Sequence, residues 1–198
     1  MKNNIKPHKG KVSREDRWKH NEHRSSLIWI TGLPGSGKST IAHELEYWLF
    51  QKDVRTFVLD GDNVRQGLCR DLGFSASDRR ENLRRVGEVA RLFVDAGILT
   101  IAAFASPYRA DRLMVRQLFD EGNFIEVYLK CSLSVCESRD PKGLYGKARR
   151  GEIQNFTGVS DPYEPPDNPE IILETDKLSV EESVNIIIRF IKDRALIR

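Results

Sequence analysis

One short segment constrains what this 198-residue chain can fold into more than any other feature, and it reads Gly32-Leu33-Pro34-Gly35-Ser36-Gly37-Lys38-Ser39. The segment fits the spacing G-x-x-x-x-G-K-[ST]. An apolar run at 27–30 precedes it and predicts a buried strand, while apolar residues at helical spacing follow from 39 to 50. Glycines let the backbone curl until successive N–H groups face phosphate oxygens, and the following helix adds its positive N-terminal end. The segment therefore predicts a binding site for a nucleoside triphosphate.

The residues of this loop have different expected roles. The Lys38 ammonium is expected to reach the β- and γ-phosphates, and the Ser39 hydroxyl is expected to ligate Mg²⁺. Thr40 is more ambiguous, because a helix residue is commoner than a ligand at this position. We assign ATP binding to Gly32, Leu33, Pro34, Gly35, Ser36, Gly37, Lys38, Ser39 and Thr40. The motif alone leaves a GTPase switch, a motor ATPase and a small-molecule kinase open. However, the chain has no [NT]-K-x-D guanine-reading element and is short for a motor.

Strand and helix patterns alternate along the rest of the chain. Short apolar runs predict further strands at 54–59, 98–104, 124–129 and 171–173, and helical spacing predicts helices at 78–96, 108–119, 133–139 and 180–191. Apolar strands that alternate with helices indicate an α/β fold with a mostly parallel five-stranded sheet flanked by helices, the P-loop nucleoside triphosphate hydrolase fold. Residues 140–168 interrupt the alternation with glycines, prolines and basic residues, and we expect them to form a mobile lid.

Charge and cysteine content narrow the class of protein. The formal charge is +3, but the first 26 residues hold eight Lys or Arg against three acids, a charge of +5, and the other 172 residues carry −2. A near-neutral body does not suggest a nucleic-acid surface. No apolar stretch is long enough to suggest a membrane span. Three scattered cysteines suit a reducing, cytoplasmic setting. We expect a basic leader at 1–25 and a catalytic domain at 26–198.

Candidate residues for a second substrate follow the second predicted strand. Asp60 and Asp62 stand at its carboxyl end, where ligands bind in open α/β sheets. There one carboxylate can hold Mg²⁺ through water or accept a proton from an attacking hydroxyl, although a simple Asp-Gly turn is the competing interpretation. Arg79 and Asn82 share a helix face, and arginine forks suit phosphate and sulfate oxygens. Phe74 is either a hydrophobic staple of this helix or a ring that stacks on a base.

The order of five motifs is more specific than any one of them. The sequence resembles the adenylyl-sulfate kinase family in the segments Gly32–Thr40, Asp60–Arg65, Gly73–Asn82, Ser106–Tyr108 and Lys142–Gly158. The resemblance implies Mg²⁺-dependent transfer of the ATP γ-phosphoryl group to the ribose 3′-hydroxyl of adenylyl sulfate. The products would be ADP and 3′-phosphoadenylyl sulfate, the activated sulfate of assimilation. It also implies a homodimer and leaves room for a functional link to ATP sulfurylase.

The resemblance further assigns residues to the sulfated nucleotide. It implies that the adenine of adenylyl sulfate lies between the rings of Phe74 and Phe156. It also implies that Arg65, Arg79 and Asn82 hold the phosphosulfate and adenine parts. Stacking on aromatic rings is physically reasonable, because it contributes roughly 1–3 kcal/mol per base.

Other carry-overs concern the transfer itself. Lys142 would approach the substrate from the lid, and Asp60 and Asp62 would handle Mg²⁺ and the 3′-hydroxyl. The family marks a serine matching Ser106 as a phosphoserine intermediate. No base near Ser106 in the sequence would activate it, so we expect it to position substrate during a direct transfer. The resulting assignments are catalysis by Lys38, Asp60, Asp62 and Ser106, and metal binding by Ser39 and Asp60.

Two other functions compete with this interpretation. One is another small-molecule kinase of the same fold, such as a nucleoside, gluconate or antibiotic kinase. The set formed by Phe74, Arg79 and Asn82 argues against it. The other is a non-catalytic, nucleotide-dependent module that reads nucleic acid through the basic leader. The neutral body and the complete set of phosphate and metal residues argue against that function.

Overall fold

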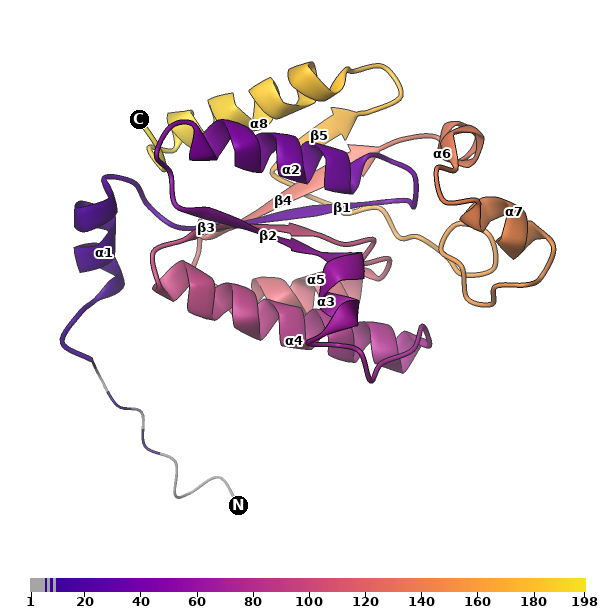
Figure 1. Ribbon diagram of the computed structural model, residues 1–198, viewed down its shortest axis with the longest axis horizontal. Coiled ribbons are helices and arrows are strands. Elements are labelled where there is room, and N and C mark those ends of the chain that lie inside the picture. The colour runs from indigo at the N-terminus through magenta and orange to yellow at the C-terminus, as the bar shows by residue number, and fades with distance from the viewer. Residues whose placement is uncertain (1–5, 7, 9) are drawn as a thin grey trace.

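The computed structural model describes residues 6, 8 and 10–198 (Figure 1). Two basic residues of the predicted leader, Lys2 and Lys9, lie outside the described residues. Five strands form one sheet in the order β2-β3-β1-β4-β5, and every pairing is parallel. The strands are β1 (Leu27–Gly32), β2 (Thr56–Asp60), β3 (Leu99–Ala103), β4 (Phe124–Lys130) and β5 (Ile171–Glu174). The predicted α/β fold with a parallel five-stranded sheet is confirmed.

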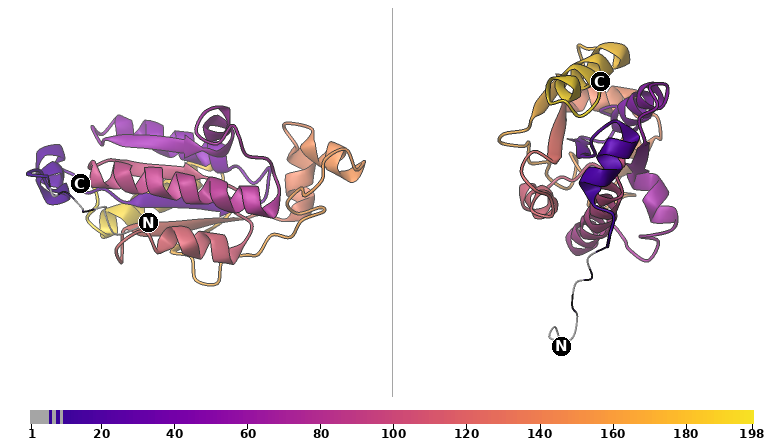
Figure 2. Two further views of the ribbon diagram at one scale, coloured as in Figure 1. Left: turned by 90° about the horizontal axis from the view of Figure 1, so that it is seen from below. Right: turned by 90° about the vertical axis from the view of Figure 1, so that its left-hand side faces the viewer.

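Helices cover both faces of the sheet (Figures 1 and 2). One face is covered by α2 (Lys38–Phe50) and α8 (Val180–Asp193), and the other by α4 (Ala76–Asp95) and α5 (Arg109–Arg116). At the carboxyl ends of the strands lie α3 (Gly61–Gln66), α6 (Leu133–Arg139) and α7 (Leu144–Arg149). At the opposite end lies α1 (Arg14–Asn21). The predicted helices at 39–50, 78–96, 108–119, 133–139 and 180–191 correspond to α2, α4, α5, α6 and α8.

Three short helices have no counterpart among the predicted elements. Helix α1 buries none of its side chains, so it has no apolar periodicity, and it begins with a capping box between Ser13 and Asp16. Helices α3 and α7 have six residues each, which is too short for a periodic pattern. Both depend on polar caps instead: Asp60 accepts from the Asp62 N–H, and Asp140 accepts from the first N–H groups of α7.

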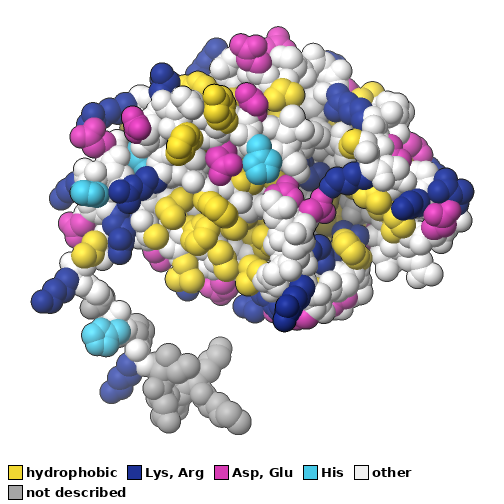
Figure 3. Space-filling view, viewed as in Figure 1, with side chains coloured by type: hydrophobic (Ala, Val, Ile, Leu, Met, Phe, Trp, Pro, Cys, Tyr) yellow, Lys and Arg dark blue, Asp and Glu magenta, His cyan; other side chains and the backbone are white. Residues whose placement is uncertain are grey.

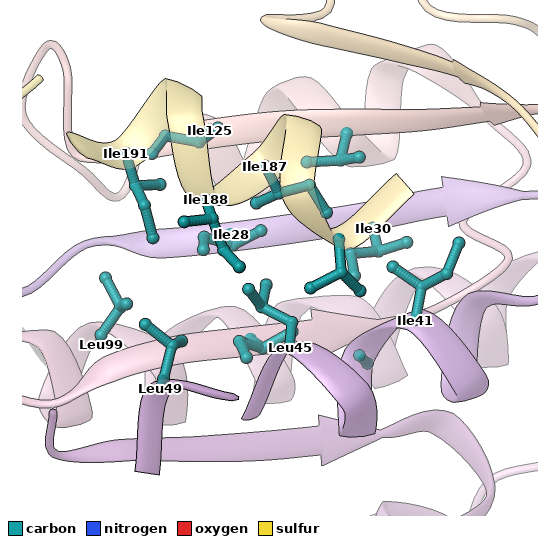
Figure 4. Packing of buried hydrophobic residues seen from close by; sticks show 14 of the residues in the cluster. Ile28, Ile30, Ile41, Leu45, Leu49, Leu99, Ile125, Ile187, Ile188 and Ile191 are labelled. Atoms are coloured by element: carbon teal, nitrogen blue, oxygen red, sulfur yellow. The ribbon is translucent and has the colours of Figure 1, made fainter. Parts of the chain in front are cut away.

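The apolar core consists of two layers, one on each face of the sheet. Alternate residues of β1 serve the two layers: Ile28 and Ile30 face α2 and α8, whereas Leu27 and Trp29 face α4 and α5. Figure 4 shows the first layer, in which isoleucines and leucines of the sheet, α2 and α8 interdigitate. Because both faces of the central strand are buried, its sequence is continuously apolar rather than alternating.

Part of the predicted leader is packed against the body. The Trp18 indole donates a 2.6 Å hydrogen bond to Ser25 Oγ, which donates in turn to the Val94 carbonyl. The Asn21 amide donates to the Gly97 carbonyl at 3.0 Å. Gly97 has φ +82°, and a Cβ there would lie 2.8 Å from that amide. Helix α1 is thereby held at the amino ends of the strands, far from their carboxyl ends (Figure 2). The division at residue 25 stays a prediction.

Other expectations from composition concern the surface and the thiols. On the face shown in Figure 3, acidic and basic side chains are interspersed rather than gathered by sign. Within the described part of the chain, no helix combines the length and apolar character that crossing a bilayer requires. The thiols of Cys69, Cys131 and Cys136 are free and buried.

Candidate active site

A cavity of about 930 Å³ opens at the carboxyl ends of β1, β2 and β3. Every predicted site residue lines it except Gly32 and Leu33, which form the base of the phosphate loop. The structure therefore brings together residues that are more than a hundred positions apart in the chain. Those lining residues are Pro34, Gly35, Ser36, Gly37, Lys38, Ser39, Thr40, Asp60, Asp62, Arg65, Phe74, Arg79, Asn82, Ser106, Lys142 and Phe156.

The phosphate loop joins β1 to α2, and its glycines are required by its shape. Gly37 has φ +96° and Gly35 has φ +77°, and a Cβ on Gly35 would lie 2.7 Å from the Cys136 carbonyl oxygen. The Lys38 Nζ donates to the carbonyls of Gly32 at 3.0 Å and Leu33 at 2.8 Å. These bonds hold the ammonium inside the loop, where a bound phosphate would compete for it.

Burial also changes the acidity of Lys38. Removal from water lowers its pKa to about 8, and the neighbouring carboxylates of Asp60 and Asp62 counteract only part of that effect. A phosphate oxygen beside the ammonium would favour the charged form. The lysine is therefore tuned to gain charge stabilisation from an anion in the loop.

Ser39 and Asp60 form a ready pair of oxygen donors. Ser39 Oγ donates to Asp60 Oδ2 at 2.6 Å, and the other carboxylate oxygen caps α3 by accepting from the Asp62 N–H at 2.9 Å. Asp60 is buried, so both of its oxygens are fixed. Mg²⁺ in phosphate sites is usually held by one or two protein oxygens, with waters and phosphate oxygens completing the octahedron. The pair fits that donor set, and the described residues contain no group of three or more His, Cys, Asp or Glu suited to a metal.

Asp62 and Lys142 connect α3 to the segment predicted as a lid. The Lys142 ammonium is ion-paired with the Asp62 carboxylate, which raises the pKa of Lys142. Both side chains are about two-thirds exposed, at 61% and 66%, so the pair faces the open cavity and not the core. An anionic substrate that enters the cavity would therefore lie near the positive charge of Lys142 and the negative charge of Asp62.

Arg65, Phe74 and Arg79 form an arginine and phenylalanine cluster in the wall of the same cavity. The Arg65 guanidinium lies 4.3 Å from the centre of the Phe74 ring, and Arg79 lies 5.7 Å from it. Phe74 is 58% exposed. A hydrophobic staple would pair Phe74 with an apolar residue one turn into α4, but that position holds Arg79, so the staple alternative has no partner.

Asn82 adds a polar group to the same wall. Its side chain is only 2% exposed, and its Oδ1 has no hydrogen-bond partner within the part of the chain that the structure describes. Buried carbonyl oxygens are nearly always satisfied, so this one is suited to a donor that a ligand supplies. Phe156 lies elsewhere in the cavity wall, 8% exposed, with its ring 5.0 Å from that of Tyr145 at an interplanar angle of 80°.

Ser106 is buried just past β3 with φ +38°, a conformation that non-glycine residues adopt rarely. Its hydroxyl donates to Thr31 Oγ1 at 2.8 Å and accepts from the Trp29 indole at 3.1 Å. Arg112 donates to its carbonyl at 2.6 Å. The hydroxyl therefore bonds to neutral groups, and its hydrogen bonds in the structure include no carboxylate or imidazole that could act as a base.

Several cavity residues were not among the predicted site residues, and two sets of them contact the phosphate loop. One follows β5: Thr175 donates from Oγ1 to the Ser36 carbonyl at 3.0 Å, and Leu178 and Ser179 line the cavity beside the phosphate loop. Arg139 holds this segment through the Thr175 carbonyl at 2.6 Å. The only available signal was their position just past the carboxyl end of a predicted strand. The other set is Tyr145 alone, which lies in the Lys142–Gly158 segment of the resemblance but was not predicted as a site residue.

Comparison with known proteins agrees with the geometry. The family model described as adenylylsulphate kinase matches residues 24–174. An adenylyl-sulfate kinase of Geotalea uraniireducens is 57% identical, over 97% of this chain and 92% of its own. A solved Mycobacterium tuberculosis APS kinase in complex with AMPPNP and APS is 44% identical with a TM-score of 0.83, covering 86% of this chain and 99% of its own.

A third relative is described as the hexameric APS kinase of Thiobacillus denitrificans. It is 31% identical with a TM-score of 0.67, over 90% of this chain and 31% of its own. The family match spans well over half of the chain and agrees with relatives aligned along nearly its whole length. The chain therefore belongs to the adenylyl-sulfate kinase family.

Proposed function

We propose that this chain transfers the γ-phosphoryl group of ATP to the ribose 3′-hydroxyl of adenylyl sulfate, giving ADP and 3′-phosphoadenylyl sulfate. One observation carries the proposal: a single cavity is lined both by the phosphate loop and by Arg65, Phe74 and Asn82. A two-nucleotide reaction needs both sites to share one space. The solved Mycobacterium relative, which holds AMPPNP and APS, supports the same pairing of substrates.

The donor side is built for a nucleoside triphosphate with its metal. The N–H groups of the loop and the Lys38 ammonium would bind the phosphates, and Lys38 would exchange its bonds to the loop carbonyls for bonds to phosphate oxygens. Ser39 and Asp60 would hold Mg²⁺, which supplies charge neutralisation on the β- and γ-phosphates. Thr175 and the residues after β5 close this side of the cavity.

The acceptor side suits a sulfated adenine nucleotide. The exposed Phe74 ring and the Phe156 ring would stack on adenine, while the unpartnered Asn82 oxygen would accept from its amino group. Arg65 and Arg79 would hold the phosphosulfate, because guanidinium forks match its oxygens. Ser106, which lines the same cavity, would also position adenylyl sulfate.

Proton transfer falls to Asp62 in this arrangement. Asp60 is occupied by Ser39 and by its own helix cap, whereas the Asp62 carboxylate is exposed to the cavity. Asp62 would accept the proton of the 3′-hydroxyl, and Lys142 would turn from Asp62 to the transferred phosphoryl group. Positioning and charge neutralisation of this kind are sufficient for a direct transfer.

The wider setting of the enzyme also belongs to the proposal. Residues 140–168 would act as a lid, and the domain would extend over 26–198 behind a basic leader. A homodimer and a functional link to ATP sulfurylase are implied by the resemblance alone, and a cytoplasmic location is proposed from the three scattered cysteines. We expect no role for nucleic acid or a membrane.

The proposal is tested by ADP release from ATP with a panel of acceptors: adenylyl sulfate, adenosine, gluconate and RNA. We expect stimulation by adenylyl sulfate alone. Lys142→Ala should lower that stimulation at least about tenfold, since charge-assisted contacts contribute roughly 1.5–3 kcal/mol. Lys52→Ala is the matched control, because Lys52 is an exposed lysine just past α2 and outside the cavity. Stimulation by another acceptor, or by none, would overturn the proposal.

A further inference from the structure

Tyr145 stands between the phosphate loop and the proposed adenine-stacking ring. Its hydroxyl donates to the Pro34 carbonyl at 2.9 Å, and its ring packs edge-on against Phe156 with the centroids 5.0 Å apart. Because the Tyr145 side chain is only 1% exposed, both contacts lie in the protein interior. One rigid side chain thus touches the wall of both nucleotide sites.

The backbone around Tyr145 is held firmly at the start of α7. The Asp140 carboxylate accepts from the N–H groups of Leu144 at 2.8 Å, Tyr145 at 3.0 Å and Gly146 at 3.2 Å. Burial raises the pKa of the Tyr145 phenol, so its hydroxyl keeps its proton and donates through neutral pH. This cap fixes the backbone position from which the Tyr145 side chain reaches Pro34.

The phosphate loop meets the same part of the chain at a second point. The Cys136 carbonyl lies so close to Gly35 that a Cβ there would be 2.7 Å away. In this part of the phosphate loop, Pro34 therefore contacts α7 and Gly35 contacts α6. A displacement of α7 would therefore move the backbone N–H groups that are proposed to bind phosphate.

We infer that Tyr145 is a positioning residue that couples the two substrate sites, so that adenine stacked on Phe156 fixes the phosphate loop through the hydrogen bond to Pro34. The inference rests on the proposed function, because it requires both nucleotides to bind in this cavity. Tyr145 touches no reacting atom. By linkage the effect is reciprocal: a nucleotide in the loop strengthens binding of adenylyl sulfate by the same factor.

The test measures the dissociation constant of ADP by calorimetry, with and without saturating adenylyl sulfate. The ratio of the two constants is the coupling factor. Tyr145→Phe removes only the hydroxyl. It should bring the coupling factor about 2- to 10-fold closer to one, because that is the effect expected from the loss of one neutral hydrogen bond. Tyr128→Phe is the matched control. It removes a hydroxyl from a partly buried tyrosine that stacks on Tyr163 and does not line the cavity, and it should leave the factor unchanged.

A second variant guards against a folding defect. Phe156→Leu keeps an apolar side chain but removes the ring that contacts Tyr145, and it should also bring the coupling factor closer to one. If Tyr145→Phe lowers the melting temperature yet keeps the wild-type factor, Tyr145 is merely structural and the inference is wrong. A wild-type factor of one also overturns it while leaving the proposed function intact. Failure of the wild type to bind adenylyl sulfate refutes the proposed function itself, and the inference with it.

Discussion

Arg79 of α4 donates a 2.5 Å hydrogen bond from Nη2 to the backbone carbonyl of Asn155, 76 residues further along the chain. The same guanidinium donates from Nε to the Phe74 carbonyl at 3.0 Å. Since Phe156 follows Asn155 directly, one arginine connects the backbone segments that carry both proposed stacking rings. The acceptor site is therefore assembled from α4 and the lid segment together.

The exposed ring of Phe74 gives the cleanest test of stacking. Phe74→Ala removes little core packing because the ring is 58% exposed, yet it removes one face of the proposed adenine clamp. We expect the dissociation constant of adenylyl sulfate to rise about 5- to 150-fold, the equivalent of roughly 1–3 kcal/mol. Binding of an ATP analogue should change less than about twofold on the same reasoning. Calorimetric titration of each nucleotide checks this, and an equal loss for both would exclude the clamp.

The Ser39 and Asp60 pair is tested by a variant that keeps the helix cap. Asp60→Asn retains an oxygen for the Asp62 N–H but loses the carboxylate charge, so we expect kcat to fall at least about 100-fold and to need more Mg²⁺. The free energy of unfolding, measured by urea denaturation, should differ from that of the wild type by less than about 1 kcal/mol.

Asp193→Asn, at the exposed end of α8, serves as the control for that experiment and should retain full activity. A magnesium dependence of Asp60→Asn that matches the wild type would show that Asp60 does not hold the metal.

The lowered pKa of Lys38 predicts how nucleotide binding depends on pH. In the free protein the ammonium loses its proton near pH 8, whereas a bound phosphate favours the charged form. Binding then requires proton uptake above pH 8, so the dissociation constant of ADP should rise there, approaching about tenfold per pH unit. Calorimetry from pH 7 to 9.5 measures this. Lys38→Arg cannot deprotonate in this range and should show a flat profile; an identical slope in both proteins would place the titration elsewhere.

Ser106 distinguishes a direct transfer from a covalent intermediate. Its hydroxyl donates to Thr31 and accepts from Trp29, and neither of these groups can serve as a base. We therefore expect inversion at phosphorus when ATP carries a chiral γ-phosphoryl group, and measurable turnover by Ser106→Ala. Stereochemical analysis of the product decides the question. Net retention, together with labelled phosphoserine at position 106, would establish the intermediate instead.

Much of the fold was predictable because its signal is apolar burial. The central strand β1 begins as a continuous apolar run, since Ile28 and Trp29, neighbours in sequence, are both fully buried on opposite faces of the sheet. Helix α7 was not predictable in this way. It starts after Gly143 at φ +63° and is held by the Asp140 carboxylate, features that leave no periodic pattern.

The same distinction, between local sequence patterns and contacts made only in the folded chain, separates the site residues that could be predicted from those that could not. Residues that belong to compact motifs, such as Lys38, were identified, and their roles in binding and transfer stay predictions. Thr175 and Tyr145 were missed because each acts through a hydrogen bond to a backbone carbonyl of the phosphate loop, more than a hundred residues away. A contact of that kind places almost no restriction on neighbouring residue types, so only the folded structure reveals it.

The central claim concerns which hydroxyl of which nucleotide receives the phosphoryl group. The most direct measurement is identification of the products by mass spectrometry and ³¹P NMR after incubation of the protein with ATP, Mg²⁺ and adenylyl sulfate. We expect 3′-phosphoadenylyl sulfate and ADP in equal amounts. Adenylyl sulfate recovered unchanged while ATP is consumed, or phosphorylated at any position other than the 3′-hydroxyl, would contradict the account.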